Sequence, residues 1–243
     1  MNPVLRWFHQ LGSPPYFYAF ATRWMPWFGW SALVLTLIGM YIGLHRAPAD
    51  YLQGDSFRII YIHVPSAWMS MFIYVAMAVN GAIALIWRIK LSEILFLACA
   101  PIGAMFTAVT LITGMLWGKP TWGAYWVWDA RLTSELVLLF LYFGVIGLAS
   151  AYDDLRQGAR AAAVLALVGV VNVPIIPFSV KWWNTLHQGE SIMSGNLAPV
   201  FLWPLLTMML AYGLLFASLW LVRIRTVILE RRIRALMQQQ GDA

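Results

Sequence analysis

The sequence predicts an all-α membrane protein, built as a bundle of six transmembrane helices. Of its 243 residues, 61% are hydrophobic and 11% are charged, whereas soluble domains have about 45–50% and about 25%. Six apolar runs are each close to the ~20 residues with which a helix crosses a bilayer. These observations exclude a soluble globular protein and predict one polytopic membrane domain over residues 1–243.

The predicted spans are these apolar runs, and each is expected to be helical because a bilayer offers the backbone no other hydrogen-bond partners. In chain order they cover residues 27–44, 64–87, 94–116, 132–151, 161–180 and 198–222. The first run follows two arginines and is not followed by a clear cleavage motif, so we interpret it as a retained signal anchor. The second begins with Pro65 in its first turn, where proline is common.

The later spans carry further local features. In the third span, Thr107, Thr110 and Thr113 recur every three residues and are expected to make interhelical hydrogen bonds. In the fifth, Pro174 and Pro177 are expected to kink or end the helix near its outer end. The arginine-rich tail at 223–240, after the sixth span, is expected to form a helix that lies on anionic headgroups.

The basic residues between the spans predict the orientation of the chain in the membrane. One side holds 11 lysines and arginines and the other holds 5. The smaller set is Arg46, Arg58, Lys119, Arg131 and Lys181. Because basic loops stay on the cytoplasmic side, both termini are expected in the cytoplasm and the three longer loops on the outer, periplasmic face. The net charge of +6 is then an insertion signal, and no nucleic-acid partner is expected.

The loop predicted at 117–131, between the third and fourth spans, is unusually aromatic. It contains Trp117, Trp122, Tyr125, Trp126 and Trp128 together with two glycines and a proline. Tryptophan favours the headgroup zone, so an interfacial belt is one reading. So many rings in a shaped loop favour the other reading, a rigid apolar platform for a large, flat aromatic ligand.

Two histidines are placed to hold such a ligand. His63 lies in the first outer loop, directly before the second span, and His187 lies in the third outer loop. His45 also lies at the outer face and His9 is expected inside. A lone histidine is usually structural, but two beside an aromatic platform are typical axial ligands of haem iron, whereas zinc would need three or four ligands. Since Cys99 is the single cysteine, haem would be bound without a covalent link, as b-type haem.

Two arginines are candidates for binding the haem propionates. Arg58 lies five residues before His63, and Arg131 lies two residues after Asp129. Guanidinium groups bind carboxylates in a bidentate manner. Either arginine could instead anchor the chain at the interface or pair with Asp129 or Glu135.

Three segments resemble a known family. Residues 122–129, Trp-Gly-Ala-Tyr-Trp-Val-Trp-Asp, are similar to the tryptophan-rich WWD signature of haem-handling proteins. Residues 61–68 and 173–188 resemble the two histidine segments of the CcmC family, the haem exporter C proteins of bacterial cytochrome c maturation. The larger CcmF and CcsA proteins share the signature but have more spans, so the size favours CcmC.

The resemblance implies a multi-pass protein of the bacterial inner membrane that holds haem on the periplasmic face. It implies delivery of haem to the chaperone CcmE, a possible role in haem export, and partnership with the ABC transporter subunits CcmA and CcmB and with CcmD. It also implies that His63 and His187 are axial ligands. The residues implied for the platform are Trp122, Trp126, Trp128 and Asp129.

Two other functions are weighed against haem transfer. A membrane redox protein of b-type would place its histidine pairs inside the spans, whereas both histidines here are predicted outside. A small-solute permease would show a polar midplane or a repeat of its halves, and neither is evident. No nucleophile, general-base pair or phosphate loop is recognisable either, so we do not expect an enzyme.

Overall fold

The computed structural model describes residues 12–183 and 197–241, and within these ranges the protein is helical with short connections. Its long helices are α2 (Pro14–Tyr41), α3 (Ile60–Trp87), α4 (Lys90–Trp122), α5 (Ala130–Ser150), α6 (Leu155–Gly169), α7 (Asn172–Trp182) and α8 (Pro199–Gly241). A π-helical turn, η1 (Ile42–Arg46), ends α2, and a 3-10 turn, η2 (Asp55–Ile59), leads into α3. Six helical segments are long and apolar enough to cross a membrane, which confirms the predicted fold class.

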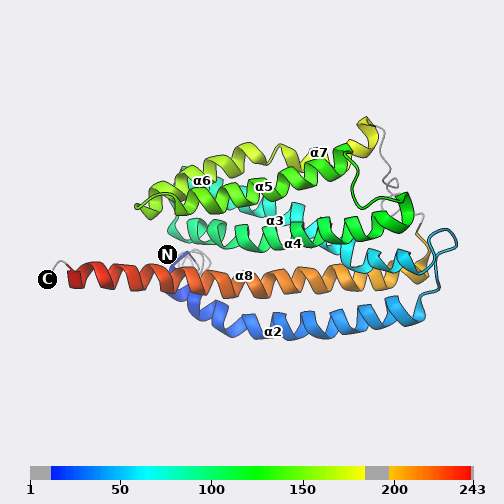
Figure 1. Ribbon diagram of the computed structural model, residues 1–243. Helices are drawn as coiled ribbons and strands as arrows, with labels where there is room; N and C mark the ends of the chain where they lie inside the picture. Colours follow the sequence, from blue (N-terminus) through cyan, green and yellow to red (C-terminus); the bar gives the residue numbers. More distant parts are fainter. Residues whose placement is uncertain (1–11, 184–196, 242–243) are drawn as a thin grey trace.

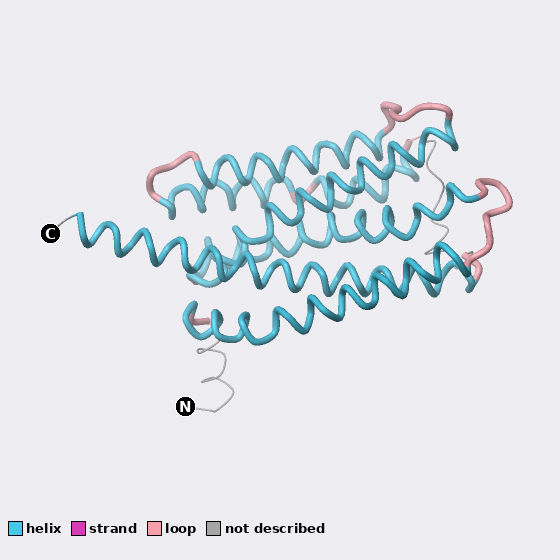
Figure 2. Tube along the Cα trace, turned by 60° about the horizontal axis from the view of Figure 1, so that its bottom comes forward, coloured by secondary structure: helices cyan, strands magenta, loops and turns pink. Residues whose placement is uncertain are grey.

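The helices form an elongated bundle (Figure 1). α2 packs along α8, α3 packs along α4, and α5 packs against α6 and α7. The same arrangement is visible after rotation (Figure 2). We call one end of the bundle the tryptophan end; there the 47–54 and 123–129 connections meet the end of α7 and the start of α8. The other end, the arginine end, carries the 151–154 connection and the C-terminal half of α8.

The predicted fifth span is two helices in the structure. α6 ends at Gly169 and α7 begins at Asn172, whereas the sequence suggested one run over 161–180. Pro174 explains the break, because it has no N–H to donate to the carbonyl of Val170 and its ring crowds that carbonyl. The amide of Val173 bonds to this carbonyl instead, at 3.0 Å.

The last helix is longer than predicted and continues through the arginine-rich tail. With 43 residues, α8 is about 64 Å long at 1.5 Å per residue, about twice the thickness of a hydrocarbon core. Its C-terminal part projects beyond the other helices (Figure 1). The helix expected at 223–240 is therefore present, but it extends α8 and is not a separate surface helix.

The core lies between α3, α4, α5 and α6. Phe96, Cys99, Tyr74 and Tyr142 are fully buried there, and the two tyrosine rings meet edge to face at 5.0 Å. Gly103 of α4 is required at its position, because a Cβ atom there would overlap the ring of Tyr142. Close helix contact at small residues is typical of membrane bundles.

The α2–α8 pair is held by small residues and polar contacts. Gly29 and Gly39 of α2 face Ser218 and Met208 of α8, so closely that a Cβ at either position would press on the partner side chain. The Ser218 hydroxyl donates to the carbonyl of Met25 at 3.0 Å. This contact joins the first and last membrane helices of the chain.

Candidate functional site

His63 lies inside a helix and not in a loop as predicted. The 3-10 turn η2 runs directly into α3, which begins at Ile60, so His63 falls in the first turn of that helix and is half-buried. Pro65 consequently lies within α3 and does not mark its start. The helix thus fixes the direction of the imidazole toward α4, where Thr113 and Gly114 lie.

A hydrogen bond to Thr113 of α4 holds the ring of His63. The Thr113 hydroxyl donates to the carbonyl of Val109 at 2.7 Å, so its single hydrogen is engaged within α4. Nδ1 of His63 lies 3.0 Å from the same oxygen, so a ring protonated at Nδ1 donates to Thr113. In that tautomer the lone pair resides on Nε2, the arrangement typical of a metal-binding histidine whose other nitrogen is held by a supporting group.

Trp117 packs against His63 from one turn further along α4. Its ring meets the imidazole edge to face at 5.6 Å, and its indole N–H donates to Oε1 of Gln53 at 2.7 Å. The ring of Phe57 also packs against Trp117, with the two ring centres 6.2 Å apart. Trp117 was predicted in a loop, but α4 continues as a helix through Trp122, so it is a helical residue that supports the histidine.

The aromatic loop itself spans only 123–129 in the structure, compared with the predicted 117–131. α4 ends at Gly123, whose φ of 80° is in the left-handed region that glycine adopts without strain. α5 begins after Asp129, whose carboxylate accepts the backbone N–H of Leu132 at 2.8 Å as an N-cap. The signature aspartate thus has a defined role in ending the loop.

The signature rings do not form one stacked surface. Trp126 and Trp128 meet edge to face at 5.3 Å, with Trp128 78% exposed. The ammonium group of Lys119 lies 5.3 Å from the centre of the Tyr125 ring, and Trp122 packs over Gly118. Nε1 of Trp126 is buried and makes no hydrogen bond within the described residues. An indole donor of this kind is usually satisfied by a partner, so this atom indicates a place for an acceptor.

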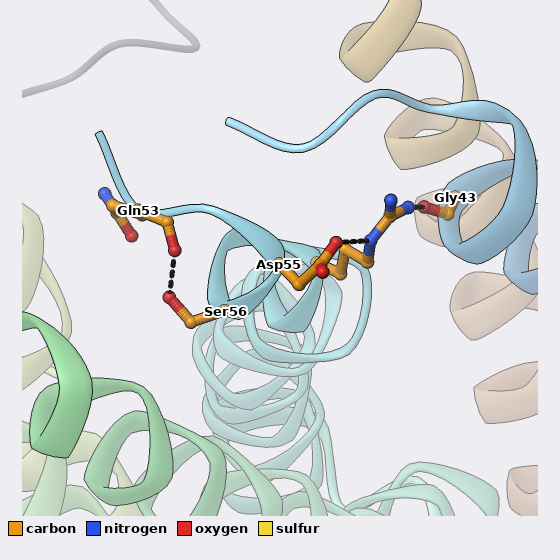
Figure 3. A network of polar contacts seen from close by, with 5 residues as sticks. Gly43, Gln53, Asp55 and Ser56 are labelled. Atoms are coloured by element: carbon orange, nitrogen blue, oxygen red, sulfur yellow. Dashed lines mark hydrogen bonds and ion pairs between the residues drawn. The ribbon is translucent and has the colours of Figure 1, made fainter. Parts of the chain in front are cut away.

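The two candidate arginines differ in their surroundings. Arg58 donates to Asp55 at 2.8 Å and to the carbonyl of Gly43 at 2.7 Å, which fastens η2 to η1 (Figure 3). Beside it, the Ser56 hydroxyl donates to the carbonyl of Gln53 at 2.6 Å, in the same turn. Arg131, in contrast, lines a small cavity together with His63. The structure therefore brings Arg131, and not Arg58, to the imidazole cavity.

This cavity of about 40 Å³ also reaches a buried polar network. Glu135 of α5 is 5% exposed and accepts a hydrogen bond from the Ser70 hydroxyl at 2.8 Å. The hydroxyl of Tyr142 donates to the carbonyl of Ser70 at 2.7 Å. A cavity of this size accommodates a few waters but no macrocycle, so a flat ligand held by His63 would lie outside it, toward the tryptophan end.

Sequence patterns pointed to some of these residues and not to others. His187 and His9 lie outside the described residues, so the predicted pairing of His63 with His187 stays a prediction. His45 lies in η1, with the centre of its ring 5.6 Å from that of Tyr41. Thr113 belongs to the threonine row that was assigned only interhelical bonds. Thr113 and His63 are 50 residues apart in the sequence, so their contact could not be predicted; it depends on how α3 packs against α4.

Comparison with known proteins identifies similar chains. A family model described as "Heme exporter protein C" (CcmC) matches residues 7–239. The "Heme exporter protein C" of Escherichia coli K12 is 52% identical over 221 residues, which is 91% of this chain and 90% of that protein. Its namesake in Bradyrhizobium diazoefficiens is 48% identical over 236 residues, with 96% and 89% covered, and that of Haemophilus influenzae is 47% identical over 228 residues, with 93% of each covered.

Proposed function

Since the chain belongs to the heme exporter protein C family, we propose that it holds haem at the tryptophan end, on the periplasmic face, and delivers it to the haem chaperone CcmE. The family assignment itself gives a haem-handling component of cytochrome c maturation. Together with the six apolar helices it gives a multi-pass protein of the inner membrane. We propose in addition the face of the membrane on which haem is held, the residues that bind it and the protein that receives it.

The observation that carries this proposal is the state of His63. Its Nδ1 is hydrogen-bonded to Thr113, and with the proton on Nδ1 the lone pair is on Nε2, which suits an axial ligand of iron. Trp117 restrains the ring from the side. His63 is thereby pre-organised for a metal centre before any ligand arrives.

The remaining contacts to haem are assigned as follows. His187 is the second axial ligand, so that non-covalent b-type haem has an imidazole on each face. Arg131 binds a propionate, since it lines the cavity at His63. Nε1 of Trp126 supplies a further donor at the rim. Arg58 contributes through η2, which it holds in place, and the rings of Trp122, Tyr125 and Trp128 cover part of the apolar macrocycle.

Transfer requires that a partner reach the bound haem. Trp128 and Tyr125 are 78% and 52% exposed, so the aromatic loop forms an open rim and not a closed pocket. A protein that docks on this rim can take over the macrocycle as the axial bonds are released. CcmA, CcmB and CcmD are the further partners in haem transfer. In the proposed topology, both termini of the chain lie in the cytoplasm.

The test is an optical titration of the purified protein with ferric haem. Wild type is expected to give a low-spin six-coordinate spectrum. His63→Ala and His187→Ala should each give weaker, five-coordinate binding, because one imidazole remains. His45→Ala, a histidine at the same end, is the matched control and should behave as wild type. A changed spectrum for the His45 variant alone would contradict the assignment.

Delivery is tested separately with the loaded protein. Mixing it with haem-free CcmE should move haem to CcmE, whereas the His63→Ala variant, loaded to the same occupancy, should transfer at a different rate because one iron bond is missing. Transfer to CcmE that is no faster than from free haem in detergent would refute delivery while leaving haem binding intact.

A further inference from the structure

A second cavity lies at the arginine end, far along the bundle from His63. Its volume is about 260 Å³, and it is bounded by α4, by the end of α5 and by α8. The inner wall is apolar and made of small or rigid side chains, Ala100 and Pro101 of α4 and Val145 and Ala149 of α5. The small size of the alanines leaves the hollow between α5 and α8, which do not pack closely along this stretch.

The outer wall of the same cavity is charged. Arg223, Glu230, Arg231 and Arg234 line it from α8, and their spacing of seven, eight and eleven residues from Arg223 places them on one helix face. α8 continues past the other helices (Figure 1), and these four residues of its C-terminal half line the cavity.

The charges at the mouth do not cancel. Arg223 pairs with Glu230 at 3.3 Å, and Arg231 pairs with Glu93 of α4 at 2.5 Å. Arg234 has no ion-pair partner within the described ranges, and Nε of Arg223 is buried without a hydrogen bond to any described group. The exposed guanidinium of Arg234 is therefore available to an anion at the mouth of the cavity.

We propose that this cavity binds one phospholipid with a negatively charged headgroup, such as phosphatidylglycerol, from the surrounding leaflet. The phosphate lies at Arg234, and an acyl chain runs along the wall of Ala100, Val145 and Ala149. Basic pockets between membrane helices suit such headgroups. The apolar wall favours a lipid over free phosphate, which would use only the mouth. The proposal does not depend on haem binding at the other end.

The test is native mass spectrometry of the full-length protein in detergent, with added phosphatidylglycerol or phosphatidylethanolamine. Wild type is expected to retain one phosphatidylglycerol. Arg234→Gln should weaken this binding about tenfold, the effect of losing one charge-assisted hydrogen bond. Arg232→Gln is the matched control, because Arg232 is an exposed neighbour on α8 that does not line the cavity. It should bind as wild type.

Two further arms separate the lipid from other anions. Ala149→Leu fills the space beside the apolar wall without changing any charge, so this variant should also lose phosphatidylglycerol. Millimolar inorganic phosphate, added to wild type, should not displace the lipid. Equal retention by the Arg234 and Arg232 variants would overturn the proposal. So would equal binding of the zwitterionic lipid, or full competition by inorganic phosphate. Melting temperatures close to wild type verify that each variant is folded.

Discussion

At the scale of single residues, the ring of His63 is restrained from three directions. Nδ1 is hydrogen-bonded to the hydroxyl of Thr113, the ring of Trp117 packs edge to face against the imidazole at 5.6 Å, and Gly114 leaves room for Cε1. Each restraint comes from α4, so the position of the imidazole depends on the contact between α3 and α4. Changes in α4 should therefore alter ligand binding at His63 without touching the histidine itself.

Replacing Thr113 by Val should weaken haem binding about 10–100-fold, the usual effect of losing the group that supports a metal-binding histidine. The isosteric change removes the acceptor of the Nδ1–H, so the ring loses its fixed tautomer. A haem titration measures the affinity. Thr107→Val is the control, because Thr107 is a buried threonine of the same helix that bonds only to the carbonyl of Gly103 among the contacts described. Equal affinities for the two variants would show that Thr113 does not support the ligand.

Replacing Gly114 by Ala should also impair haem binding, for a steric reason. The new Cβ would lie 3.1 Å from Cε1 of His63, which is tight enough to push the ring from its position. A shifted or weaker low-spin spectrum is the expected readout. Gly147→Ala in α5 is the matched control, since no atom lies within 4 Å of its added Cβ. An unaltered spectrum for the Gly114 variant would mean that the imidazole has room to move.

At the scale of elements, the aromatic loop is defined by how its two flanking helices end. Gly123 terminates α4 and Asp129 caps α5. Asp129→Ala should lower the free energy of unfolding by about 1 kcal/mol, the usual effect of losing an N-cap. Asp129→Asn should restore it, because the amide oxygen can still accept from Leu132. Thermal unfolding of the haem-free protein in detergent measures both.

The same pair of variants distinguishes capping from ligand binding. If Asp129 acts only through the cap, Asp129→Asn should bind haem as wild type does. Loss of haem binding in this variant, with stability retained, would instead indicate that the carboxylate charge itself is needed at the site.

The sequence was most informative where hydrophobic runs decide the structure. The six apolar segments and the aromatic segment are local patterns, and the structure contains them, although the fifth segment is two helices and His63 lies inside α3. The ends of the helices were harder to predict, since α2, α4 and α8 all extend into polar or aromatic segments that a hydropathy pattern does not include. The partners of His63 were not predictable, because they lie 50 and 54 residues away and depend on helix packing.

At the scale of the whole molecule, the two ends of the bundle differ in chemistry. One end carries the exposed Trp128, Trp182 and Trp183 and the His63 cavity, and the other carries the arginine face of α8. The positive-inside rule assigns the arginine end to the cytoplasm. We therefore expect the two proposed sites in opposite leaflets.

This orientation is open to a labelling experiment in intact cells. In a background lacking Cys99, cysteine at Trp126 should react with a membrane-impermeant thiol reagent, because the rim faces the periplasm. Cysteine at Lys90 or Arg232 should be protected until the membrane is permeabilised. Labelling of Lys90 together with protection of Trp126 would reverse the topology.

The pairing of α2 with α8 has a consequence for how the chain is made. A ribosome adds about 5–20 residues per second, so the stretch from Tyr41 to Pro199 takes about 8–30 s to synthesise. During that interval α2 is already in the bilayer while the helix that covers Gly29 and Gly39 does not yet exist. Lipid must occupy this face first, and this part of the bundle closes only when α8 arrives and displaces it. The α2–α8 contact thus waits for the synthesis of α8.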